Sequence, residues 1–261
     1  MAQTDTRPAG ARFMDWLRGD AKSIRARFYR QPMEWLDLFW STKVRGESYT
    51  EWYRRRMNRM AAKSKAANRP VNPAYLDNAE RQVNYLKHRG LKPHHDFLEY
   101  GCGILRVGLH LMKYMEDGRY VAADISENRI RKGVGILEEN GIDPSRYRTV
   151  VLTDAQAKEL GDQKFDFIMA HDVFPHMPTD ECLVCLKTLS RHLKPDGQLF
   201  VTFSIADAPH ATNAKDYWVT PKEVHRIGEA AGLSVSEEKD WEQYRLEIQP
   251  DQSMFRFVLP G

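Results

Sequence analysis

One stretch, residues 97–103, constrains the fold of this chain more than any other. It reads Phe-Leu-Glu-Tyr-Gly-Cys-Gly, a short apolar run that ends in an acid and two glycines, and a leucine- and methionine-rich segment of helical length, 104–115, follows it directly. A strand that breaks into a glycine turn and feeds a helix is how parallel α/β folds build a nucleotide site. Glycine lacks a Cβ, so the backbone of such a turn can approach a ligand closely. Taken alone, the turn is equally compatible with a purely structural role.

Further apolar runs that end in acidic or histidine residues follow this turn. The runs and the residues after them are 120–123 with Asp124, 149–152 with Asp154, and 165–170 with His171 and Asp172. Helix-like stretches separate the runs, and strands that alternate with helices predict a parallel sheet with crossover connections. Ligands of such sheets bind at the carboxyl ends of the strands. We therefore expect these side chains to gather at one edge of the sheet, together with Glu99.

The remaining pattern after residue 95 completes a sheet flanked by helices. Further helices are predicted over 127–140, 155–160, 179–193 and 221–231, and further strands over 198–204, 233–235 and 253–258, with a polar loop at 205–218. Ser126 is the predicted N-cap of the first of these helices. No helix separates the last two strands, which favours antiparallel pairing between them. The sequence therefore predicts a doubly wound, mostly parallel α/β sheet with an antiparallel last strand.

Composition narrows the class of protein. The 261 residues are 42% hydrophobic and 29% charged, which is ordinary for a globular domain. No apolar run approaches the roughly 18 residues that cross a bilayer, and residues 1–13 lack the apolar core of a secretory signal. The three cysteines do not make a disulfide framework, so a cytoplasmic location is expected. Cys182 and Cys185 have the spacing of a redox or metal pair but lie in a predicted helix without a second pair, so buried thiols are expected there and no metal site.

Five short motifs follow one another along the predicted sheet. They are Leu98–Gly103, Ala123-Asp124, Thr153–Ala155, Phe165–Ala170 and Leu193–Gly197. Asp124 follows Glu99 by about 25 residues, which is comparable to the spacing between glycine turn and acid in dinucleotide-binding folds. With these motifs, the segment 75–261 resembles a class I S-adenosylmethionine (SAM)-dependent methyltransferase, which implies a seven-stranded Rossmann-like sheet. Residues 173–177 also resemble the loop after the fourth strand in many small-molecule and glycan methyltransferases.

The resemblance implies a role in SAM binding for each matching residue. Gly101 and Gly103 would let the backbone meet the methionine part of SAM, and Glu99 would organise that loop and the amino group. Asp124 would accept hydrogen bonds from the ribose hydroxyls. The other implied contacts come from Cys102, Ile125, Asp154, Ala155 and His171, with Asp154 and Ala155 at the adenine. Leu105 stands where a third glycine is common, and it is expected to continue the following helix early.

The chemistry of the donor determines what the acceptor side needs. SAM carries a sulfonium cation, so transfer depends mainly on holding the nucleophile in line with the methyl group. A hydroxyl acceptor also needs a base, and the predicted candidates are, in order, His176, His171 and Asp172. Loops often determine specificity, so the side chains after the fifth strand could line the acceptor pocket, namely His210, Tyr217 and Trp218. The expected acceptor is an oxygen or nitrogen of a small metabolite or glycan.

Residues 1–74 are expected to form a helical extension before the domain at 75–261. Helices are predicted over 12–30, 32–42 and 49–66, and a fourth over 75–88 leads into the sheet. Residues 1–95 hold 20 Lys and Arg but 9 Asp and Glu, interleaved with aromatics. Three interpretations stay open: packing, a cap over the active site, or contact with a nucleic acid or anionic membrane surface. The alternative functions are accordingly an RNA methyltransferase and a non-catalytic SAM-fold module that binds an anionic partner; the oligomeric state is left open.

Overall fold

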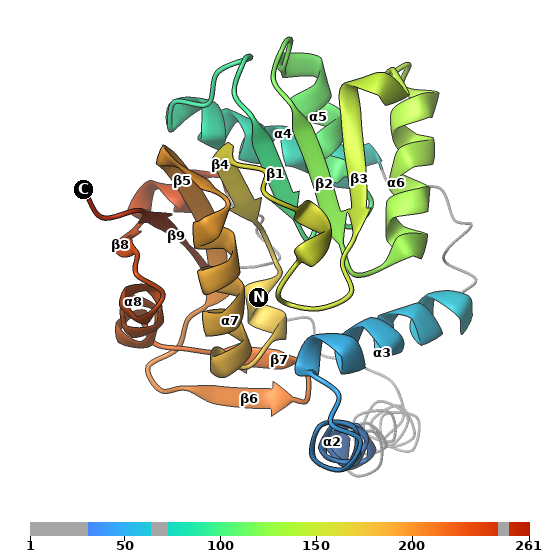
Figure 1. Cartoon of the computed structure of the whole chain (residues 1–261), viewed down its shortest axis with the longest axis vertical. Coiled ribbons are helices and arrows are strands. Elements are labelled where there is room, and N and C mark those ends of the chain that lie inside the picture. The colour runs from blue at the N-terminus through green and yellow to red at the C-terminus, as the bar shows by residue number, and fades with distance from the viewer. Residues whose placement is uncertain (1–30, 64–72, 245–250) are drawn as a thin grey trace, which may run out of the picture. The chain divides into compact units, whose positions relative to one another are not determined.

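The computed structural model describes residues 31–63, 73–244 and 251–261 (Figure 1). The helix expected over 12–30 lies outside these ranges. The chain divides into two compact units, Met1–Glu47 and Ser48–Gly261. In the first unit, α2 (Gln31–Phe39) runs into a π-helical turn, Trp40–Val44. Among the helices of the described ranges, none is long and apolar enough to cross a membrane.

The second unit is built on a seven-stranded sheet with the order β3-β2-β1-β4-β5-β9-β8. The strands are β1 (Phe97–Tyr100), β2 (Tyr120–Asp124), β3 (Tyr147–Val151), β4 (Phe165–Ala170), β5 (Leu193–Ser204), β8 (Ser234–Glu237) and β9 (Gln252–Val258). The first five run parallel to one another, and β9 is antiparallel to both β5 and β8. This topology confirms the predicted doubly wound sheet with an antiparallel last strand.

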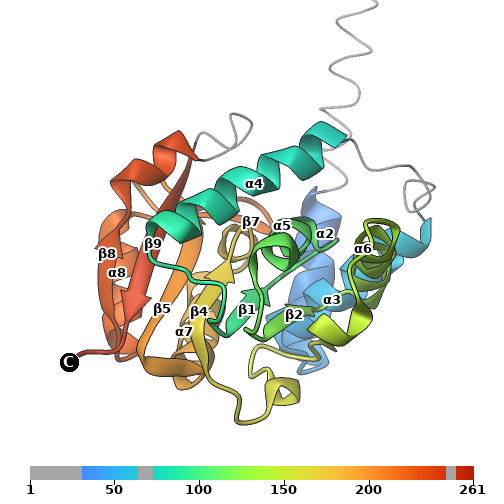
Figure 2. The same ribbon diagram turned by 90° about the horizontal axis from the view of Figure 1, so that it is seen from above.

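Helices cover both faces of the sheet (Figure 2). On one face α4 (Pro73–His88), α5 (Arg106–Tyr114) and α6 (Glu127–Glu139) form one hydrophobic core, and on the other α7 (Thr179–Arg191) and α8 (Pro221–Ala230) contribute to a second. Every residue of β1 and of β2 is buried, as expected for strands covered on both faces. α3 (Tyr49–Lys63) runs beside the edge where the strands of the parallel part end (Figure 1).

The structure corrects several boundaries that were predicted from the sequence. The segment 205–218 is not simply a polar loop, because β6 (His210–Asn213) and β7 (Asp216–Trp218) form an antiparallel hairpin there. The helix predicted over 155–160 is a single 3-10 turn, Lys158–Leu160. Further 3-10 turns lie at Pro144–Arg146, Phe174–His176 and Lys239–Gln243.

Two predicted helix starts have a different local structure. Ser126 occupies the N-cap position of α6, but its side chain makes no capping hydrogen bond. α5 does not start early at residue 104 or 105, because Leu105 adopts a left-handed conformation with φ 58° and ψ 33° and the helix begins at Arg106. By contrast, the hydroxyl of Thr220 accepts from the Glu223 N–H and caps α8, which begins at Pro221 as predicted.

Candidate functional site

A cavity of about 480 Å³ opens at the carboxyl ends of β1, β2 and β4. The strand order reverses between β1 and β4, and this switch point is where open α/β sheets bind ligands. Nine of the residues predicted from the sequence line the cavity: Glu99, Gly101, Cys102, Gly103, Asp124, Ile125, His171, Asp172 and His176. Asp154 and Ala155 are not among its lining residues. Their expected contact with adenine therefore stays a prediction without support from this cavity.

At one end of the cavity, the glycine-loop end, the turn after β1 meets the carboxylate after β2. Gly101 has φ +80°, and a Cβ built on it would overlap the Cγ2 methyl of Val173. Gly103 donates its N–H to Oδ2 of Asp124 at 2.8 Å, and Ser126 donates its N–H to Oδ1 of the same carboxylate at 2.8 Å. Asp124 therefore ties the turn after β1 to the start of α6.

Leu105 takes the backbone conformation that a glycine usually supplies. A left-handed backbone costs a residue with a Cβ about 1–2 kcal/mol. The Leu105 side chain is completely buried in the core under α5, which offsets this cost. Gly133 of α6 packs against it so closely that a Cβ there would overlap the backbone of Ile104. The sequence signal for this contact was the glycine inside an otherwise regular helix.

Glu99 and Asp124 are both buried acids at the glycine-loop end. Burial raises the pKa of Glu99 to about 7, although the Tyr120 hydroxyl donates to its carboxylate and Arg106 lies near. Burial also raises the pKa of Asp124, while the charge of Arg129 and the N–H donors of the loop oppose that shift. Arg106 and Arg129 line the cavity as well. The cationic side chains at this end were not predicted from the sequence.

His171, at the tip of β4, belongs to a buried polar chain. Its Nε2 lies 3.2 Å from Nε2 of Gln82 on α4, and Oε1 of Gln82 lies 3.5 Å from the Arg106 guanidinium. An amide nitrogen only donates, so Nε2 of His171 accepts this hydrogen bond. Burial and the Arg106 charge lower the pKa of His171 to about 4. A histidine held neutral in this way is a weak base near pH 7.

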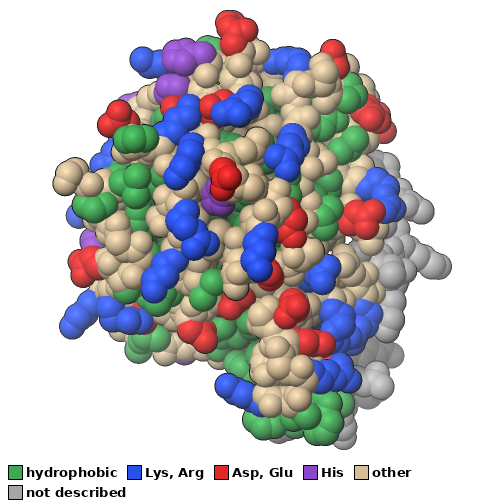
Figure 3. Space-filling view, viewed as in Figure 1, with side chains coloured by type: hydrophobic (Ala, Val, Ile, Leu, Met, Phe, Trp, Pro, Cys, Tyr) green, Lys and Arg blue, Asp and Glu red, His purple; other side chains and the backbone are tan. Residues whose placement is uncertain are grey.

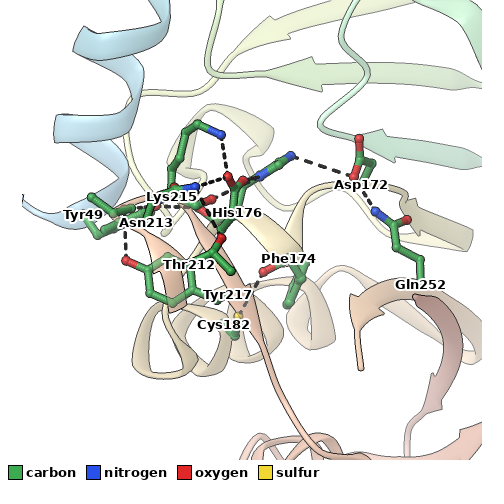
Figure 4. Close-up of polar contacts among 12 residues, drawn as sticks. Tyr49, Asp172, Phe174, His176, Cys182, Thr212, Asn213, Lys215, Tyr217 and Gln252 are labelled. Carbon is green, nitrogen blue, oxygen red and sulfur yellow. Dashed lines mark hydrogen bonds and ion pairs between the residues drawn. The ribbon is translucent and has the colours of Figure 1, made fainter. Parts of the chain in front are cut away.

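The other end of the cavity, the histidine end, is built around His176 (Figure 4). Nδ1 of His176 lies 2.9 Å from Oδ1 of Asp216 and 3.1 Å from the carbonyl oxygen of Lys215, and Nε2 lies 3.8 Å from Oδ1 of Asp172. Burial lowers the pKa of His176, but the carboxylates of Asp216 and Asp172 outweigh burial and raise that pKa above its usual value. His176 is thus better suited than His171 to take up a proton near neutral pH.

Helix α3 supplies an aromatic stripe to the histidine end. Tyr49, Tyr53 and Met57 recur at every fourth position, so they share one helix face, and all three line the cavity. The Tyr53 ring stacks on the His176 ring with centroids 6.2 Å apart and planes 20° apart. The Tyr49 hydroxyl donates to the carbonyl of His176 at 2.6 Å and lies 3.2 Å from the carbonyl of Ala214. The four-residue spacing was the signal that could have identified this face.

Several expected acceptor contacts occupy other places. His210, Tyr217 and Trp218 do not line the cavity: His210 stacks on Trp218 within the β6–β7 hairpin, and the Tyr217 hydroxyl donates to the carbonyl of Ala214. Cys182 and Cys185 are buried in α7, as predicted. Among the described residues, no group of three or more His, Cys, Asp or Glu is arranged to hold a metal ion.

Residues 97–197 match the family described as "Methyltransferase domain". The match begins with β1 and the glycine loop and continues through β4 and His176 into β5, but it does not include the cavity residues of α3 or Lys215. This stretch is therefore similar to a methyltransferase domain. The seven-stranded topology that the resemblance to class I methyltransferases predicted is the one observed.

Solved structures of methyltransferases share this fold. Magnesium protoporphyrin IX methyltransferase from Synechocystis PCC 6803 with bound S-adenosylhomocysteine (SAH) is 16% identical, with a TM-score of 0.61, over 82% of this chain and 100% of that one. An S-adenosylmethionine-dependent methyltransferase from Clostridium acetobutylicum ATCC 824 is 13% identical, with a TM-score of 0.55, over 79% and 99%. The glycopeptide N-methyltransferase MtfA is 14% identical, with a TM-score of 0.56, over 71% and 92%. At these identities the similarity establishes the fold alone.

Proposed function

We propose that this protein transfers a methyl group from SAM to an oxygen of a small molecule or of a single end group on a glycan. The observation that carries the proposal is one continuous cavity with a buried glycine turn and acids at one end and a histidine with a raised pKa at the other. Similar folds are described with SAM or SAH bound. A volume of 480 Å³ that must take donor and acceptor together favours a small acceptor.

The residues at the glycine-loop end fit the donor. In the proposed complex, Gly101 and Gly103 let the backbone approach its methionine part, and Glu99 meets the ammonium group. Arg106 is a buried cation close to Glu99 and suits the carboxylate of the same amino acid. Asp124 keeps lone pairs on both oxygens for the ribose hydroxyls, besides the two N–H groups it accepts. When bound, SAM supplies a methyl group on a sulfonium, which needs a nucleophile in line with it.

The residues at the histidine end prepare that nucleophile. His176 takes the proton from an acceptor hydroxyl on its Nε2 as the new carbon–oxygen bond forms, and releases this proton to solvent afterwards. Tyr53 and Tyr49 orient the acceptor between α3 and the loop after β4. In this proposal α3 acts as the cap that the aromatic N-terminal region suggested, whereas Glu99 and His171 have no part in moving the proton.

Nucleic acid is a less favoured acceptor. The Arg side chains at 54–56 of α3 are half-buried rather than fully exposed, and Arg56 lies over the Trp52 ring. On the face seen in Figure 3, Lys and Arg side chains are mixed with Asp and Glu and form no continuous field of one sign. Nucleic-acid-binding proteins usually present a clustered basic stripe. These features support a small acceptor over an RNA.

The proposal is tested in two steps on the full chain. Calorimetry and thermal unfolding with SAH measure donor binding, and the expected result is saturable heat and a raised melting temperature. The second step uses SAM with an isotopically labelled methyl group. Candidate acceptors are matched small molecules that differ only in bearing a hydroxyl, a carboxyl or an amine, and a short RNA. Label in the oxygen acceptors supports the proposal. Absence of SAH binding refutes the donor, whereas label in RNA or in amines alone refutes the acceptor class.

A further inference from the structure

The Asp216 carboxylate contacts the Nδ1 side of the His176 ring and does not itself line the cavity. Nδ1 of His176 lies within hydrogen-bond distance of two oxygens, Oδ1 of Asp216 at 2.9 Å and the Lys215 carbonyl at 3.1 Å. Neither oxygen carries a proton, because a carbonyl never does and the pKa of Asp216 is held far below its usual range by His176, Lys215 and Asn213 against the effect of burial. Nδ1 therefore keeps its hydrogen in both charge states of the ring, and Nε2 is the nitrogen that titrates.

Asp216 is itself held in a fixed position by the β6–β7 hairpin. Its Oδ2 accepts from Nδ2 of Asn213 at 2.5 Å and from Nζ of Lys215 at 2.7 Å. Oδ1 of Asn213 accepts the Lys215 N–H at 2.9 Å and closes the turn. The Tyr49 hydroxyl connects this hairpin, through the Ala214 carbonyl, to the carbonyl of His176. The carboxylate therefore cannot swing away from the imidazole without breaking several contacts.

The carboxylate of Asp172 lies on the Nε2 side of the His176 ring. Asp172 lines the cavity and its Oδ1 lies 3.8 Å from Nε2 of His176, too far for a direct hydrogen bond. Asp172 is fixed by two contacts, since its N–H donates to the Thr202 hydroxyl at 2.8 Å and its Oδ1 accepts from Nε2 of Gln252 at 2.6 Å. Nε2 of His176 points toward Asp172 across this gap (Figure 4), and both residues line the cavity.

We propose that Asp216 is a positioning residue that fixes the tautomer and orientation of His176, so that Nε2 receives the proton of the acceptor. This inference rests on the proposed role of His176. The groups that face the imidazole are the carboxylates of Asp172 and Asp216, the Tyr53 ring and, through Asp216, the Lys215 ammonium. Asp216 does not line the cavity, so its effect on an acceptor passes through His176.

The first test needs no acceptor. The full chain is labelled with ¹⁵N-histidine, the resonances of His176 are assigned with H176Q, and the tautomer and pKa are followed by NMR in the presence of SAH. We expect Nδ1 to stay protonated in the wild type across the titration. In D216N the pKa of His176 should fall by about one unit or more and the Nε2–H tautomer should appear. D207N, which removes an exposed carboxylate from the connection between β5 and β6, should leave both unchanged.

The second test uses the acceptor that takes the label. With D216N, kcat should fall about tenfold or more while KM changes by less than about twofold, and the acid limb of the pH profile should move to lower pH. If Asp216 has only a structural role, D216N should lower the melting temperature and leave the tautomer and pKa of His176 and the pH profile as in the wild type. That result would overturn the inference. If D216N fails to fold, D216E replaces it. Wild-type protein that carries the Nε2–H tautomer when neutral contradicts the inference with no variant at all.

The failure of this inference can be told apart from the failure of the proposed function. If H176Q turns over normally, the proposed base is wrong, and the role of Asp216 in catalysis fails with it. If H176Q is inactive while D216N keeps its rate and pH profile, only the role of Asp216 is wrong. Absence of SAH binding refutes the donor and leaves the tautomer measurement in the free protein as the test of Asp216.

Discussion

The glycine-loop end and the histidine end of the cavity differ in how far apart their contacting residues lie in the sequence. At the glycine-loop end, the two partners of the key hydrogen bond, Gly103 and Asp124, are 21 residues apart and lie at the carboxyl ends of adjacent parallel strands. At the histidine end, His176 meets Tyr49 across 127 residues and Asp216 across 40. The first end follows from one supersecondary unit, whereas the second exists only once helix, loop and hairpin have met. The sequence signal for the first end is therefore local, whereas the second end combines three separate parts of the chain.

The sharpest way to separate the two ends is H176Q. The variant removes the proposed base but keeps a polar side chain of similar length. General-base catalysis typically contributes about 10²- to 10⁴-fold to a rate, so kcat should fall by that factor. Calorimetry should find the affinity for SAH within about twofold of wild type. H210Q is the control, since His210 is exposed on the β6–β7 hairpin and does not line the cavity. Equal losses in both variants would contradict the assignment.

Gly101 belongs to the glycine-loop end but packs against Val173 in the loop that leads to His176, so G101A should disturb both ends. The left-handed backbone at φ +80° and the overlap with Val173 each penalise a Cβ, and together they should lower the free energy of unfolding by about 2–4 kcal/mol. Denaturant unfolding and SAH titration measure the effect. The double variant G101A/V173A relieves the overlap but not the backbone strain, so about half of the loss should return. If the double variant is no more stable than G101A, the whole loss of unfolding free energy comes from backbone strain.

Glu99, at the glycine-loop end, should make the free energy of unfolding depend on pH. Its folded-state pKa, about 7, lies above that of an exposed glutamate, so the folded protein holds this proton more tightly than the unfolded chain. Its contribution to stability is therefore present below about pH 4.5 and is lost as pH rises through 7. Relative to wild type, E99Q should gain up to about 3 kcal/mol in free energy of unfolding between pH 5 and pH 8 without ligand. An unchanged difference between the two pH values would refute the raised pKa.

The two ends also differ in how far the sequence predicts them. Glu99, Gly101, Gly103 and Asp124 were identified because strand ends, acids and glycines leave a regular local pattern. The stripe on α3 and Asp216 were not identified, because pairing them with His176 depends on where a hairpin and a separate helix come to rest. Local patterns also mislead where burial overrides them: Leu105 accepts a left-handed backbone because its side chain fills the core.

The next smaller effect is expected from variants that test the proposed contact between Asp124 and the ribose. D124A should weaken SAM binding by roughly tenfold or more, the scale of a lost charge-assisted hydrogen bond. Because the carboxylate also accepts the N–H groups of Gly103 and Ser126, D124N is needed to preserve part of that loop while removing the charge. D154A is the comparison at the predicted adenine position, which does not line the cavity. Unchanged SAM affinity in D124A would refute the ribose contact, and a loss in D154A would support the adenine prediction.

The smallest expected effect belongs to Y49F, and it tests how the histidine end is held together. The variant keeps the ring against Tyr53 and removes only the hydroxyl that donates to the His176 carbonyl. Losing one such bond should cost about 1 kcal/mol of unfolding free energy and lower kcat a few-fold, with SAH affinity unchanged. Y217F is the matched control, because the Tyr217 hydroxyl donates to the same Ala214 carbonyl without reaching His176. If Y217F slows turnover as much as Y49F, the hairpin as a whole sets the position of His176. If only Y49F slows it, α3 positions the histidine directly, and the cap is part of the catalytic geometry.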